Sequence, residues 1–189
     1  MMKRAFFFWL IIGFTLNLSA QDFFREKDDF NKPIVILTNP TVKNLKTINF
    51  LLKERLLKLK SGEIQFVGVY FEDQKYDFGH SRTFIDTSDI QHFFLHEVRG
   101  ELEPASLFEK NSCTAELKMI FDHSSGIFFF GGPDIPPVVY QEENSRAVVT
   151  DPHRHYFETT FLFHLLGGSR NNQFTAFLHQ KPAFFITGF

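Results

Sequence analysis

The chain holds 189 residues, with 20 Lys or Arg against 22 Asp or Glu and a formal net charge of −2. This near-neutral balance has no polyanion-binding footprint, which argues against nucleic acid as a partner. Cys113 is the only cysteine, so an internal disulfide is excluded, and packing must supply the stability, for which 27 phenylalanines provide apolar bulk.

The first 20 residues have the pattern of a secretory signal peptide. Lys3 and Arg4 precede an apolar run over residues 5–16, and small residues follow up to Ala20, where cleavage is expected. The apolar run is shorter than the ~20 residues that a membrane-spanning helix needs, so a permanent anchor is not expected. We therefore expect a secreted or periplasmic protein that is free of the membrane after cleavage, with residues 21–189 as its folded part.

Strand and helix patterns alternate at the start of the folded part. Residues 33–38 form a short apolar run that predicts a buried strand, and residues 44–60 carry apolar side chains at helical spacing. Residues 63–71 predict a second buried strand. Strand, helix and strand at this spacing predict a βαβ unit, and therefore a parallel sheet of the α/β class.

Residues 72–116 are less regular, and their histidines raise the alternative of a metal site. Apolar spacing over residues 84–98 favours a helix, on which His92 and His96 would lie four residues apart. Two such histidines can share a metal ion, but they lack the His-Glu-x-x-His order and no third ligand is evident, so neither metal nor cofactor is predicted. Cys113 has no charged motif around it that would lower its pKa, which favours an unreactive thiol.

A loop rich in glycine and proline follows the next predicted strand. Residues 115–121 predict a short helix, and the apolar run 127–130 predicts a buried parallel strand bounded by glycines. Gly131 and Gly132 allow positive φ angles and close approach of a ligand, while Pro133 stiffens the loop. Ligands of open α/β sheets lie beyond the carboxyl ends of strands, so bare N–H groups here can bind an anion. The alternative is a tight turn that binds nothing.

A helix with a clear start follows a polar connector. Asp151 and Pro152 have the pattern of an N-cap and a first helical residue, for a helix that continues to Leu166. Arg154 and Glu158 lie four residues apart, so they share one face of this helix and can pair. The alternative for these two residues is a solvated surface ion pair that contributes little.

The end of the chain has the pattern that opens a nucleophile elbow. Residues 172–179 predict a short helix, and residues 183–187 predict a last strand that runs into Gly188 and Phe189. In such elbows a parallel strand ending in Gly-x leads to a nucleophile on the sharp turn that follows. Gly188 and Phe189 therefore fill the two positions that precede a nucleophile.

Taken together, these motifs resemble the γ-glutamyl-γ-aminobutyrate hydrolase family, one of the class I glutamine amidotransferase-like families. The resemblance covers roughly residues 33–189 and is carried by Gly131-Gly132-Pro133-Asp134-Ile135-Pro136-Pro137 with Tyr140, by Asp151, Arg154 and Phe157-Glu158, and by residues 182–189. It implies a flavodoxin-like parallel sheet with helices on both faces. It also implies hydrolysis of a small γ-glutamyl amide through a cysteine thioester, with a later His and Glu completing the triad.

The resemblance assigns roles to single residues. Gly132 matches the loop glycine whose N–H helps hold the tetrahedral oxyanion, within a substrate loop that runs from Gly131 to Asp134. Gly188 and Phe189 match the positions before the catalytic cysteine. Cys113 cannot replace that cysteine, because it precedes the loop and follows no strand-Gly-x pattern.

The helix residues Arg154 and Glu158 match a helix face that supports the family's site. His155 stands where the family more usually has Asp, which departs from the expected charge pairing there. We expect residues 21–189 to be the N-terminal part of such a domain, inactive by itself. Two alternatives stay open: a non-catalytic binding remnant that uses the Gly131–Gly132 loop, and an exported α/β interaction or metal-binding protein that uses His92 and His96.

Overall fold

The computed structural model describes residues 22–26, 30–57, 63–88, 90, 92–168 and 174–188. Its elements in chain order are α1 (Phe23–Glu26), β1 (Ile34–Thr38), α2 (Val42–Lys53), β2 (Gln65–Phe71), α3 (Gly79–Thr87), β3 (Phe93–Val98), η1 (Pro104–Ser106), α4 (Thr114–His123), β4 (Gly126–Phe129), η2 (Pro137–Tyr140), α5 (Pro152–Leu166), η3 (Phe177–Gln180) and β5 (Phe185–Gly188). The predicted signal peptide and Phe189 lie outside these residues. Among the helices of the described ranges, none is long and apolar enough to cross a membrane.

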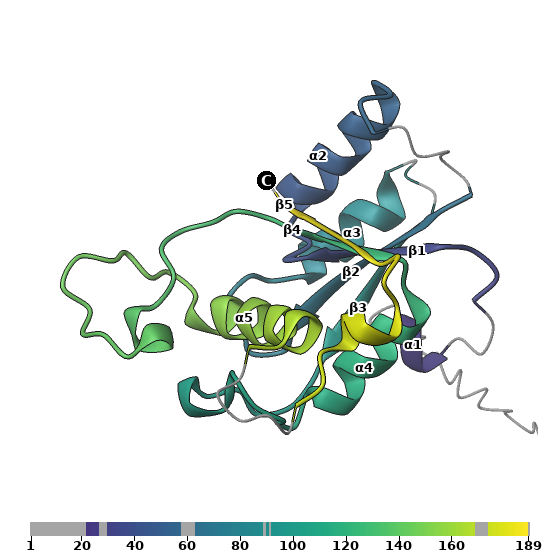
Figure 1. The fold of residues 1–189 in the computed structure, drawn as a ribbon. Helices are drawn as coiled ribbons and strands as arrows, with labels where there is room; N and C mark the ends of the chain where they lie inside the picture. The colour runs from purple at the N-terminus through teal and green to yellow at the C-terminus, as the bar shows by residue number, and fades with distance from the viewer. Residues whose placement is uncertain are drawn as a thin grey trace, which may run out of the picture.

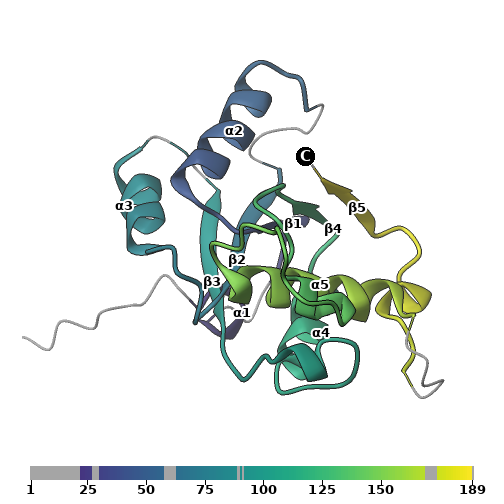
Figure 2. The ribbon, with the colours of Figure 1, turned by 90° about the vertical axis from the view of Figure 1, so that its left-hand side faces the viewer.

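Five parallel strands form one sheet in the order β3-β2-β1-β4-β5. The chain therefore builds outwards from β1 to β3, returns across the sheet to β4, and continues outwards to β5. Helices α2 and α3 cover one face, and α1, α4 and α5 cover the other (Figures 1 and 2). The prediction of a flavodoxin-like α/β fold with helices on both faces is confirmed, as is the βαβ unit formed by β1, α2 and β2.

The central strands β1 and β2 are buried on both faces, which explains why they are nearly continuous apolar runs, whereas the edge strand β5 is largely exposed. Every residue of β1 and β2 is buried. Phenylalanines fill much of the larger core layer, between the sheet and α4 and α5; its fully buried members include Phe71, Phe121, Phe157 and Phe161. The reading of the abundant phenylalanine as core material is confirmed.

The helix predicted over residues 84–98 is wrong. α3 ends at Thr87, where Ser88 turns the backbone to an extended conformation with φ −96° and ψ 143°. Residues 93–98 form β3, which pairs in parallel with β2. The apolar spacing that suggested one helix therefore belongs to the end of a helix and the following strand.

The bounds of α2 differ from the prediction at both ends. It begins before residue 44 because Thr41 caps it, with Thr41 Oγ1 accepting a hydrogen bond from the Asn44 N–H at 3.3 Å. It ends at Lys53, and Arg55 then takes a positive φ of 56°. The predicted extension to residue 60 is therefore too long.

The last predicted elements are shorter or shifted. Within the described part of residues 172–179, the structure has a single 3₁₀ turn that begins at Phe177. β5 begins two residues later than predicted and includes Gly188, which pairs with Phe129 of β4. The end of β5 therefore lies beside the end of β4.

Candidate functional site

The site lies where the chain changes direction across the sheet. β1 leads to α2 on one face, and its neighbour β4 leads to α5 on the other (Figure 1). The segments that follow the carboxyl ends of these two paired strands go to opposite faces of the sheet, and the space between them is where open α/β sheets bind ligands. Thr38 ends β1 at this point, and the Gly131–Gly132 loop follows β4.

Arg154 holds the glycine loop from behind. Asp151 caps α5 as predicted, its Oδ1 accepting from the Arg154 N–H at 3.2 Å, and this fixes the first turn of the helix. Arg154 Nη2 donates to the carbonyl oxygens of Phe130 and Gly131, the latter at 3.2 Å. The Arg154 side chain is only 7% exposed, so the alternative of a solvated surface pair is wrong.

The hydrogen bonds from Arg154 to these two carbonyls set the direction of two N–H groups. In a trans peptide the C=O and the following N–H point in opposite directions. Because the carbonyls of Phe130 and Gly131 point at Arg154, the N–H groups of Gly131 and Gly132 point away from it. Both glycines are exposed, and neither N–H donates a hydrogen bond within the described part of the chain. The loop therefore presents two adjacent free donors, as an anion site requires.

Glycine is needed at position 132 for space, not for a positive φ. Neither Gly131 nor Gly132 has a positive φ, so that part of the prediction is wrong. A Cβ at residue 132 would lie 1.8 Å from Arg154 Nη1 and 2.6 Å from its Cζ. Any side chain there would have to displace the guanidinium that holds the loop.

Glu158 joins Arg154 to the end of β1. Its Oε1 accepts from Thr38 Oγ1 at 2.9 Å and from Arg154 Nε at 3.4 Å. Burial raises the pKa of Glu158, although Arg154 and Thr38 both act to lower it. Arg154 and Glu158, the two predicted supporting residues, thus lie together at the loop. Thr38 was not predicted to belong to the site, although its position at the end of a predicted parallel strand could have indicated it.

His155, next to the arginine, is a buried imidazole without a partner for one nitrogen. The residue is 5% exposed, and its Nε2 has no hydrogen-bond partner in the part of the chain that the structure describes. Burial lowers the pKa of His155, and the neighbouring Arg154 lowers it further against the opposing charges of Asp151 and Asp134. Near neutral pH the imidazole is therefore in its neutral form.

The rest of the predicted loop shapes the backbone. Pro133 and Asp134 are exposed. Asp134 Oδ2 accepts from the Val148 N–H at 2.9 Å, which ties the two ends of the segment between β4 and α5. Of the two elbow residues, Gly188 lies at the end of β5 beside Phe129, and Phe189 is outside the described residues.

The alternative metal site is not formed. His92 and His96 do not share a helix: His96 lies in β3, and His92 precedes it with a positive φ of 71°. His96 is fully buried, with Nδ1 accepting from the Phe24 N–H at 3.4 Å and Nε2 lying 3.0 Å from Glu116 Oε1. Among the described residues, no group of three or more His, Cys, Asp or Glu could hold a metal ion.

Cys113 is unreactive by its surroundings, as predicted. The residue is fully buried at the start of α4, and burial raises the pKa of its thiol to about 11. A thiol in that state carries almost no thiolate near neutral pH, so it is a poor nucleophile.

Comparisons of the chain with protein-family models, with curated proteins and with solved structures found no match. Three features of the geometry define the site: a switch point in a parallel sheet, a glycine loop with two free donors, and a buried Arg154–Glu158 pair that fixes the loop.

Proposed function

We propose that this edge of the sheet is the oxyanion-binding part of a site that hydrolyses γ-glutamyl amides. The observation that carries the proposal is the pair of N–H groups at Gly131 and Gly132 that point away from Arg154. Hydrogen bonds from Arg154 to the Phe130 and Gly131 carbonyls fix their direction. Hydrogen-bond donors that are fixed before reaction stabilise the negative charge that develops on a carbonyl oxygen in the transition state.

The position of β5 supports this proposal. The resemblance to γ-glutamyl hydrolases puts a nucleophilic cysteine after Phe189, at the end of this strand. The register pairs Phe129 with Gly188, so the end of β5 lies beside the end of β4, from which the glycine loop leaves. A thiolate there would add to the γ-carbonyl carbon, and the carbonyl oxygen of the tetrahedral intermediate would carry the negative charge beside the loop N–H groups. Collapse of this intermediate breaks the C–N bond, the amine leaves with a proton from the later His that the resemblance implies, and water then hydrolyses the remaining thioester.

The remaining residues act as positioning groups. Arg154 orients the loop, Glu158 holds Arg154 against the sheet, and Thr38 fixes Glu158 through its hydroxyl. A non-catalytic binding protein is the second candidate, because two free N–H groups would also hold the oxygen of a carboxylate. Both candidates require the loop to recognise its ligand, and they differ in which ligand is preferred.

The test measures binding to the chain by two-dimensional NMR of its ¹⁵N-labelled amides. Titration with γ-glutamyl-γ-aminobutyrate should shift the Gly131 and Gly132 signals in a saturable manner, and the α-linked isomer should shift them less. Equal shifts with both isomers and with acetate would favour simple carboxylate binding. No shift of the two glycine signals at millimolar ligand would refute both candidates.

A pair of variants separates loop orientation from general effects. Thr38→Val removes the hydroxyl that holds Glu158 while keeping side-chain volume, so it should weaken binding. Thr83→Ala removes an exposed hydroxyl on α3 that bonds only to a backbone carbonyl of its own helix, and it should leave binding unchanged.

A further inference from the structure

The segment between β4 and α5 forms an arm, residues 133–150, that stands off from the body of the protein (Figure 1). Its shape is fixed by internal hydrogen bonds from Val148 N–H to Asp134 and from Ala147 N–H to Asn144 Oδ1, both at 2.9 Å. It exposes large apolar side chains: Ile135 (51%), Val138 (47%), Tyr140 (57%) and Val148 (68%). An arm that keeps its shape and exposes apolar groups is typical of a contact surface.

The tip of the arm combines apolar and acidic groups. The 3₁₀ turn η2 carries Val138 and Tyr140, and Gln141 then reverses the backbone with a positive φ of 67°. Glu142 and Glu143 follow and are exposed. Neither carboxylate has an ion-pair partner among the described residues. The tip is therefore an apolar knob beside two free negative charges.

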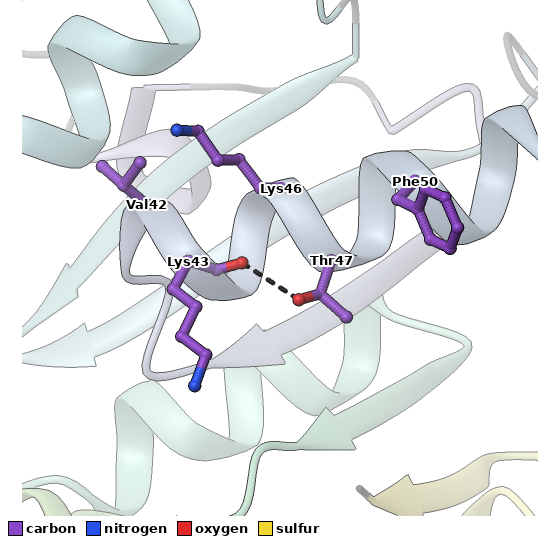
Figure 3. Close-up of a pocket in the computed structure, with 5 residues that line it drawn as sticks. All are labelled: Val42, Lys43, Lys46, Thr47 and Phe50. Carbon is purple, nitrogen blue, oxygen red and sulfur yellow. Dashed lines mark hydrogen bonds between the residues drawn. The ribbon is translucent and has the colours of Figure 1, made fainter.

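Helix α2 carries a surface of the opposite character. A shallow concavity of about 560 Å³ is lined by Val42, Lys43, Lys46, Thr47 and Phe50 (Figure 3). The Phe50 ring is 56% exposed. The Thr47 hydroxyl donates back to the Lys43 carbonyl at 3.1 Å, so its hydrogen is used within the helix.

The two lysines have no acidic partner. No carboxylate within the described ranges pairs with Lys43 or Lys46, and the Lys46 ammonium lies 5.4 Å from the centre of the Phe84 ring. The concavity, which we call the α2 groove, thus pairs apolar surface with two free positive charges. Its chemistry is complementary to that of the arm tip.

We propose that two copies of the chain associate through reciprocal contacts, with the arm tip of each copy seated in the α2 groove of the other. The arm follows the end of β4 and α2 begins after the end of β1, so both lie at the carboxyl edge of the parallel sheet and can face one partner there. Figure 1 shows the arm on the α5 side of the sheet and α2 on the other side, so the arm tip does not lie on the α2 groove of its own chain. Two equivalent contacts related by a two-fold axis close the assembly as a dimer. Val138 and Tyr140 pack on the groove, and Glu142 and Glu143 face the two lysines. The proposed dimer does not rest on the hydrolase function, although the arm begins at Pro133 and Asp134 of the substrate loop and its contact would border that loop.

Charge reversal tests the proposal through the molar mass of the full chain, measured by sedimentation velocity. The natural chain should be a dimer at micromolar concentration. K43E/K46E and E142K/E143K should each be monomeric, because like charges then meet at both contacts. The control E101K/E109K reverses two exposed glutamates elsewhere and should stay dimeric.

Mixing the two monomeric variants gives the decisive result. In the mixture, the reversed arm meets the reversed groove and the natural arm meets the natural groove, so a heterodimer should form. Recovery on mixing also shows that both variants are folded. A monomeric natural chain, growth into open-ended chains, or variants that stay dimeric alone would each overturn the proposal, as would failure of the mixture to dimerise.

Discussion

Adding one methyl group at Gly132 should disrupt the glycine loop through Arg154. The Cβ of Gly132→Ala would lie 1.8 Å from Nη1 of the guanidinium, so the arginine must move. Moving it breaks the hydrogen bonds to the Phe130 and Gly131 carbonyls, and hydrogen bonds to charged groups contribute about 1.5–3 kcal/mol each. It also separates a pair with Glu158 that is mostly buried, for which losses of about 3–5 kcal/mol are typical.

Because the loop is exposed and water can replace part of these bonds, we expect the free energy of unfolding to fall by about 3 kcal/mol. Urea denaturation followed by circular dichroism measures this change. The same experiment on Arg154→Ala, and on the double variant, completes a double-mutant cycle.

The cycle isolates the cause. In the Arg154→Ala background no guanidinium remains to be displaced, so Gly132→Ala should change the free energy of unfolding by less than about 0.5 kcal/mol. The two single costs would then be far from additive. Additive costs would refute the reasoning, because they would mean that position 132 requires glycine for a reason other than the arginine.

Three further predictions concern residues other than Gly132. Cys113 should react with a thiol reagent at pH 8 only when the chain unfolds in urea, since burial raises its pKa to about 11. Burial lowers the pKa of His155 and His164 in the folded chain, so the unfolded chain takes up protons first as the pH falls below 6.5. The free energy of unfolding, measured by urea denaturation, should therefore be lower at pH 5.5 than at pH 7.5. The difference should be smaller in His155→Gln, which lacks one of the two imidazoles. Glu116→Ala should speed tryptic cleavage after Arg25, because Glu116 accepts a hydrogen bond from the Arg25 side chain and so holds helix α1 on the body of the protein; an unchanged rate would contradict this.

Elements with strong local signals could be predicted from the sequence. The apolar run of β1 and the Asp151-Pro152 start of α5 depend on neighbours within a few residues, and both are confirmed. The prediction of a helix over residues 84–98 was wrong because it, too, depended on a local pattern alone. Apolar spacing over a short window fits a buried strand as well as a helix, and pairing with β2 decides between them.

The candidate site could be predicted in place but not in mechanism. A glycine pair after a strand indicates a loop at the carboxyl edge, and the spacing of Arg154 and Glu158 indicates a shared face. The sequence does not show that Arg154 reaches back to the Phe130 carbonyl, 24 positions earlier. Nor does it show that Gly132 leaves room for that arginine, because this contact exists only after β4 and α5 have packed.

The arrangement at the loop uses a buried charge to orient neutral groups. The guanidinium of Arg154 donates hydrogen bonds to two carbonyls and so fixes the orientation of their peptide groups, and the Glu158 carboxylate balances the positive charge of the guanidinium. The N–H groups of Gly131 and Gly132 are thereby fixed in direction, although neither donates a hydrogen bond to any residue that the structure describes. A lysine at position 154 could not do the same, since one ammonium lacks the planar fork that spans two carbonyls and a carboxylate. Because the described hydrogen bonds from Arg154 go to the carbonyls of the loop, both N–H groups stay available to an anion.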